Sequence, residues 1–177
     1  MSKRLAVKKL AYIALFTVLI VVGGFVRIPV GTIPITLQTL FVLLGASLCG
    51  KTVGALSAVV YLIIGLIGVP VFSAGGGIFY VLQPTFGYLL GFVLAGLIAG
   101  VPKKGFWSRL GLNLLSIIVI HVVGVVYFYL ISNFYLDISL GLSQVILSGS
   151  IIFLPVDIIS ATLSAIIANK VYPIVNK

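Results

Sequence analysis

The feature that most constrains this chain is a series of long apolar runs, the last of which carries one acid at its centre. That run, residues 145–169, has about the length that a helix needs to cross a membrane. Its midpoint is Asp157, and Pro155 just before it removes a backbone donor and is expected to bend the helix. An ionised carboxylate at this depth costs roughly 3 kcal/mol on insertion scales, so it normally faces a cavity or a partner. Asp157 is therefore either part of a ligand or ion site, or a protonated or paired residue that holds a helix bundle together.

Composition excludes an ordinary water-soluble domain. Only 7% of the 177 residues are charged and the mean hydropathy is +1.37, whereas about a quarter of the residues of soluble domains are charged. The apolar runs are continuous and do not alternate, which favours helices over a β-barrel. The net charge of +9 comes from basic residues at the ends of apolar runs, so it indicates topology signals and contacts with anionic lipid rather than nucleic acid. A single cysteine offers neither a disulfide nor a metal-ligand set.

The sequence predicts a single transmembrane domain over residues 1–177, all-α, in the cell membrane of a prokaryote. Ten of the eleven basic residues fall on one side if the chain starts inside, and only Arg27 falls outside, so both termini are predicted to be cytoplasmic. The N-terminal run is too long for a signal peptide and lacks a cleavage site. Pairs of glycines four residues apart are expected to let the helices pack closely. The six predicted spans are residues 10–26, 35–49, 53–69, 86–101, 110–132 and 145–169.

The predicted outer segments are residues 27–36, 69–85 and 132–144. The first two are rich in Pro and Gly but remain apolar, so they are expected to fold over the mouth of the bundle as a lid. Gly75, Gly76 and Gly77 would allow a close backbone approach to a ligand there, with Phe79 beside them. The alternative is a flexible hinge that does not contact a ligand.

A pocket that opens outward is predicted from the start of the fourth span. Thr85, Tyr88 and Phe92 share one helical face at spacings of three and four residues, and Tyr127 lies at the outer part of the fifth span. Gln83 lies near the helix start, where unpaired amides together with Arg27 would favour an anionic group. The pocket suits a small amphipathic molecule with hydrogen-bond donors at one end and a carboxylate at the other.

Other chemistry is less well supported. His121 is the midpoint of the fifth span and could meet Asp157 near the midplane, and Ser160 is one of several serines nearby. One histidine and one acid are a poor metal set, and serines in membrane helices more often bond backbone. Residues 45–52 match the phosphate-loop pattern literally but lie at the end of a predicted span, without the strand and the metal-binding acid that a nucleotide site needs. Another subunit would have to hydrolyse any ATP, and the chain itself needs no cofactor.

Four stretches resemble the BioY family, the biotin-specific substrate-binding subunits, or S components, of energy-coupling-factor transporters. They include the elements Pro-Ile-Thr-Leu-Gln-Thr, Pro-Val-Phe and Pro-Thr-x-Gly-Tyr-Leu-x-Gly-Phe and cover roughly half of the chain in order. The resemblance implies six helices, biotin bound from outside, and association with a transmembrane coupling subunit and two ATPases. The stretches are residues 28–51, 61–77, 83–92 and 154–157.

Carried over to this sequence, the resemblance assigns the family's acid to Asp157, its glycine-rich loop to Gly75–Gly77 and its aromatic residue to Tyr88. The chain departs from the family at Ser160, where a lysine is frequent, and at His121, where many relatives have tyrosine. Ala11 and Ala14 are the best candidates for the seam that docks the coupling subunit, although they are three residues apart rather than four. The alternatives are an S component for another small vitamin and a protein without a transport role, namely an intramembrane enzyme or a packing adaptor.

Overall fold

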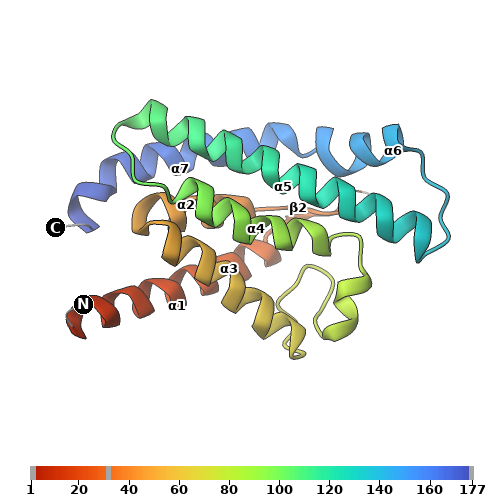
Figure 1. The fold of residues 1–177 in the computed structure, drawn as a ribbon, viewed down its shortest axis with the longest axis horizontal. Helices are drawn as coiled ribbons and strands as arrows, with labels where there is room; N and C mark the ends of the chain where they lie inside the picture. The colour runs from red at the N-terminus through yellow and green to blue at the C-terminus, as the bar shows by residue number, and fades with distance from the viewer. Residues whose placement is uncertain (1–2, 31–32, 176–177) are drawn as a thin grey trace.

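The computed structural model describes residues 3–30 and 33–175, which form a bundle of helices (Figure 1). Three stretches, Leu5–Phe25, Phe106–Phe134 and Leu142–Val175, are long and apolar enough to cross a membrane, and α2, α3 and α4 are shorter apolar helices. The predicted all-α membrane architecture is confirmed, whereas six complete crossings remain a prediction. The α-helices are α1 (Lys3–Phe25), α2 (Gln38–Cys49), α3 (Lys51–Leu66), α4 (Phe86–Ala99), α5 (Phe106–Phe134), α6 (Leu142–Ile146) and α7 (Leu154–Val175).

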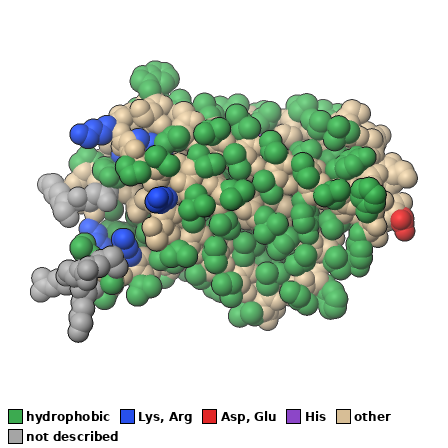
Figure 2. All heavy atoms as spheres, viewed as in Figure 1, with side chains coloured by type: hydrophobic (Ala, Val, Ile, Leu, Met, Phe, Trp, Pro, Cys, Tyr) green, Lys and Arg blue, Asp and Glu red, His purple; other side chains and the backbone are tan. Residues whose placement is uncertain are grey.

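Helix α2 lies at the centre of the bundle, in contact with α1, α3, α4, α5 and α7. The two ends of the chain lie at the same end of the bundle (Figure 1), where Lys8 Nζ donates a hydrogen bond to the Val175 carbonyl at 2.6 Å. Figure 2 shows basic side chains gathered at this end and apolar side chains over the flank of the bundle. This charge distribution supports the predicted orientation, since basic residues of membrane proteins favour the cytoplasmic side.

Small residues set the distance between the helices, as their spacing in the sequence predicts. A Cβ added at Gly54 of α3 would lie 2.5 Å from the Ala46 Cβ of α2, and one added at Gly91 would lie 2.9 Å from the Ile120 Cα of α5. Side chains at these positions would push the backbones apart, so the glycines allow the close packing typical of membrane helices.

The segments at the other end are more regular than the sequence predicts. Residues 27–36 include a short antiparallel hairpin, in which β1 (Arg27–Ile28) pairs with β2 (Ile35–Thr36). The glycine-rich segment continues into η1 (Ile78–Leu82), a 3₁₀ helix, before α4 begins. Backbone N–H and C=O groups in apolar surroundings need hydrogen-bond partners, and the pairing of the two strands supplies them.

The last apolar run is interrupted rather than a regular helix. Helix α6 passes into η2 (Leu147–Ile151), a π-helical segment, and α7 begins only at Leu154. Pro155 is the second residue of α7, where its missing N–H does not break an intrahelical bond. Asp157 therefore lies in the first turn of α7, where the partial positive charge of a helix start favours a carboxylate.

Candidate functional site

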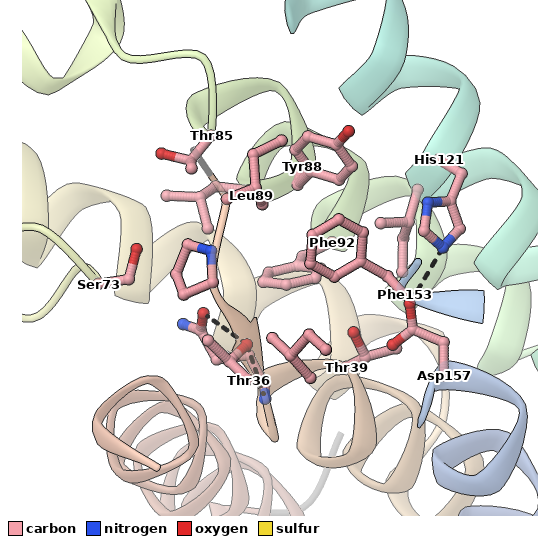
Figure 3. A pocket seen from close by; sticks show the side chains of 15 residues that line it. Thr36, Thr39, Ser73, Thr85, Tyr88, Leu89, Phe92, His121, Phe153 and Asp157 are labelled. Carbon is pink, nitrogen blue, oxygen red and sulfur yellow. Dashed lines mark hydrogen bonds and ion pairs between the residues drawn. The ribbon is translucent and has the colours of Figure 1, made fainter. Parts of the chain in front are cut away.

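A pocket lies between α2, α4, α5, α7 and the hairpin, with Asp157 and His121 on one side of it (Figure 3). Its empty space is about 570 Å³, open mouth included. Most of the side chains that face it are apolar or aromatic. We call this the central pocket, and its lining residues are Ile33, Pro34, Ile35, Thr36, Gln38, Thr39, Ser73, Thr85, Tyr88, Leu89, Phe92, Ile120, His121, Phe153 and Asp157.

His121 of α5 and Asp157 of α7 form a buried pair in this pocket. His121 Nε2 lies 3.0 Å from Asp157 Oδ2, and the two residues are only 6% and 8% exposed. The pairing predicted for the two span midpoints is confirmed. His121 Nδ1 is buried and has no hydrogen-bond partner among the described residues. The pair supplies a shielded acceptor, the type of group that binds an N–H donor strongly.

Helix α4 supplies the aromatic wall. Thr85, Tyr88 and Phe92 all line the central pocket, as their spacing predicts. The Tyr88 ring packs edge-on against His121 with 6.2 Å between ring centroids, and its hydroxyl donates to the Gly149 carbonyl in η2. Tyr88 therefore connects α4 to the interrupted part of the last run and holds the His121 ring in place.

Three polar residues before and within α2 also line the pocket, and none of them is among the site residues predicted from the sequence. Thr36 Oγ1 donates to Gln38 Oε1 at 3.2 Å, and Gln38 Nε2 donates to the Tyr61 hydroxyl at 2.6 Å. Gln38 and Thr39 are buried. Polar side chains grouped at the start of an otherwise apolar helix were the available signal, since buried polar groups in membrane helices usually mark function.

A second hollow adjoins the central pocket and shares Pro34, Ser73 and Thr85 with it. Its empty space is about 760 Å³, open mouth included. Arg27 and Gln83, the two residues predicted to attract an anion, both line it. We call this the entrance hollow, and its other lining residues are Pro29 and Ala74. If a ligand extends from Asp157 into this hollow and carries an anionic group at its outer end, that group would lie near the Arg27 guanidinium.

The glycine-rich segment does not place its predicted residues at either hollow. Gly75, Gly76 and Gly77 line neither of them, and Gly77 N–H donates to the Gly65 carbonyl at 2.7 Å. Phe79 is 79% exposed and faces away, whereas its neighbour Tyr80 is buried. The glycines therefore shape the loop against α3 in this structure.

Two further candidates from the sequence lie beside the central pocket without lining it. The Tyr127 hydroxyl donates to the Val81 carbonyl, and its ring packs against Phe86 with 5.8 Å between centroids. Ser160 is buried in α7, one turn after Asp157. Neither residue is among those that line the central pocket.

Comparisons with known proteins agree on one family. The model of the BioY family matches residues 1–177. The "Probable biotin transporter BioY" of Lysinibacillus sphaericus is 41% identical over 182 residues, which cover 98% of this chain and 91% of that protein. The "Biotin transporter BioY" of Thermotoga maritima is 35% identical over 168 residues, which cover 92% and 95%.

A solved structure is similar along almost the whole chain. It is the crystal structure of "the S-component for biotin from an ECF-type ABC transporter", with a TM-score of 0.85 and 27% sequence identity. The match covers 98% of this chain and 95% of that chain. The order and packing of the helices described above are therefore those of a known membrane S component.

Proposed function

The chain belongs to the BioY family, and from that premise we propose that it is the biotin-binding membrane subunit, or S component, of an energy-coupling-factor transporter. It is a multi-pass protein of the prokaryotic plasma membrane and a transport component rather than an enzyme. The single observation in its own structure that carries the proposal is a buried carboxylate in an apolar pocket that leads to a cationic entrance.

The two ends of biotin match the two ends of this cavity. Its ureido ring offers two N–H donors, and Asp157, held by His121, supplies a shielded acceptor for them. The fused rings are apolar on their faces and suit the wall formed by Tyr88 and Phe92. The valerate carboxylate would extend into the entrance hollow, where Arg27 and Gln83 lie.

The partners of the chain in this proposal are a transmembrane coupling subunit and two ATPases, which would hydrolyse ATP and leave the chain without a cofactor of its own. Gly50 forms the turn between α2 and α3, so the phosphate-loop pattern lacks the preceding strand that a nucleotide site requires. Ala11 and Ala14 are exposed on α1, and this small-residue face is our candidate for docking the coupling subunit.

Mass spectrometry of small molecules released from the purified chain tests the proposal, followed by titration with a panel of vitamins. We expect biotin to be recovered, or to bind without nucleotide and more tightly than thiamine, riboflavin or niacin. Tighter binding of another vitamin would instead make the chain an S component of different specificity. Absence of binding for the whole panel by a folded sample would contradict a role in substrate capture.

A further inference from the structure

A second cavity with a cationic lining lies at the opposite end of the bundle from the entrance hollow. It is enclosed by the turn between α2 and α3, the loop between α4 and α5, and the last turns of α7. Its empty space is about 420 Å³, open mouth included. We call it the basic-end cavity, and the lining residues that matter here are Ser47, Gly50, Gly100, Lys103, Arg109 and Tyr172.

Arg109 is the most buried cation of this cavity, with an exposed fraction of 3%. Its Nη1 donates to the Ser47 carbonyl at 2.7 Å, and the guanidinium lies over the Tyr172 ring at 4.4 Å from the centroid. Nη2 makes a longer contact with the Lys103 carbonyl at 3.4 Å. Nε is buried and has no hydrogen-bond partner among the described residues. These contacts hold the guanidinium in place and include a carbonyl in the last turn of α2, which carries partial negative charge. No carboxylate of the described residues pairs with Arg109.

Lys103 adds a second positive charge to the same cavity. Its Nζ donates to the Ala99 carbonyl, and burial, followed by the nearby charge of Arg109, lowers its pKa to about 8. The chain has only two acids. Asp157 is paired with His121, and Asp137 lies in the loop after α5, at the other end of that helix. Because buried charges are unfavourable without a counter-charge, and neither side-chain acid lies at the cavity, the cavity is suited to an anion.

The backbone beside the cavity does not add donors to its lining. Helix α3 begins at Lys51, directly after Gly50, but no residue of its first turn lines the cavity. A Cβ added at Gly100 would lie 2.2 Å from the Lys51 amide nitrogen, so the chain after α4 covers this amide. The cationic side chains remain, and the guanidinium fork of Arg109 matches phosphate oxygens.

We propose that the basic-end cavity is a binding site for a phosphate group, held by Arg109 and Lys103. The phosphate belongs either to the headgroup of an anionic phospholipid or to a free phosphate ion. Both present the same oxygens to Arg109 and Lys103.

Native mass spectrometry of the full chain in a neutral detergent tests this site with three probes: phosphatidylglycerol, diacylglycerol without phosphate, and inorganic phosphate. We expect phosphatidylglycerol to bind at least tenfold more tightly than diacylglycerol if the source is a lipid. Binding of inorganic phosphate with the same residue dependence would identify the free ion as the source. Equal binding of phosphatidylglycerol and diacylglycerol, without any binding of inorganic phosphate, would overturn the proposal.

Three variants assign the phosphate to this cavity. Arg109→Gln and Lys103→Gln should each weaken binding of the phosphate probe about tenfold, while Lys104→Gln, at an exposed neighbouring lysine, should change it less than twofold. If Arg109→Gln does not fold, Lys103→Gln decides, because this side chain lies at the edge of the cavity. Equal effects of Lys103→Gln and Lys104→Gln would overturn the proposal. The Kd for biotin, measured on the same samples, reports on the central pocket separately and should not change.

Discussion

His121 Nε2 and Asp157 Oδ2 lie 3.0 Å apart and join α5 to α7 beside the central pocket. Both side chains are largely removed from solvent, and neither forms another side-chain hydrogen bond with the described residues. Loss of one partner of a buried pair leaves the other buried without compensation, so each side chain keeps the other in position. The pair therefore both shapes the pocket and presents a fixed acceptor to a ligand.

Replacement of His121 tests the structural half of this role. His121→Leu should lower the free energy of unfolding by about 3 kcal/mol, because it leaves the Asp157 carboxylate buried without its partner. His121→Gln, which keeps a donor of similar reach, should recover more than half of that loss. Thermal unfolding in detergent gives both values. Equal melting temperatures for the wild type and His121→Leu would show that the pair does not stabilise the bundle.

Arg27 tests the position of the ligand's anionic end. Arg27 is exposed in the entrance hollow, and exposed charge pairs contribute about 0.2–1 kcal/mol. Arg27→Gln should therefore weaken biotin binding by a factor of roughly 1.5 to 5. The same variant should bind biotin amide, which lacks the carboxylate, as the wild type does. A calorimetric titration at low salt measures both, and an equal loss for both ligands would remove Arg27 from carboxylate recognition.

Phe79 and Tyr80 form a matched pair of aromatic neighbours. Phe79 is exposed, whereas Tyr80 is buried and its hydroxyl contacts Ser73 Oγ at 3.1 Å and accepts from Thr85 Oγ1 at 3.0 Å. Tyr80→Phe should weaken biotin binding about fivefold, since it removes roughly 1 kcal/mol of hydrogen bonding that positions two lining residues. Phe79→Ala should change the Kd less than twofold. The reverse order of effects would mean that the loop closes differently around the ligand.

The helices and the buried pair were predictable because they follow from strong local signals. Long apolar runs fix the spans, and the central positions of His121 and Asp157 in two neighbouring spans bring them together. The outer segments carry no comparable signal. In η1 (Ile78–Leu82) the 3₁₀ geometry directs Tyr80 inward and Phe79 outward. Sequence spacing does not predict which of these two adjacent aromatic residues is buried.

The contribution of α2 to the pocket was missed for a different reason. Gln38 and Thr39 come from the start of a short apolar helix, and they face the pocket only because α2 lies at the centre of the bundle. That position depends on how α1, α3, α4, α5 and α7 pack around it. Periodicity within one segment reports its own buried face and does not report which neighbours enclose it.

Gly76 tests the structural role of the glycine-rich loop. A Cβ at this position would overlap the Val69 carbonyl, which is backbone and cannot turn aside. Gly76→Ala should therefore lower the free energy of unfolding by about 1–3 kcal/mol. Gly111→Ala in α5, where no atom lies within 4 Å of the added Cβ, should be neutral or stabilising by up to about 1 kcal/mol. Thermal unfolding of both variants checks this, and equal melting temperatures would contradict the packing of Gly76 against Val69.

Titration of the purified chain with biotin, in the wild type and in Asp157→Asn, tests the central claim most directly. The wild type should bind about one biotin per chain without nucleotide or partner subunits. Asp157→Asn should weaken binding roughly 10- to 100-fold, since hydrogen bonds to charged groups contribute about 1.5–3 kcal/mol. An Asp157→Asn variant that unfolds at the same temperature as the wild type and binds biotin with the same Kd would contradict the account.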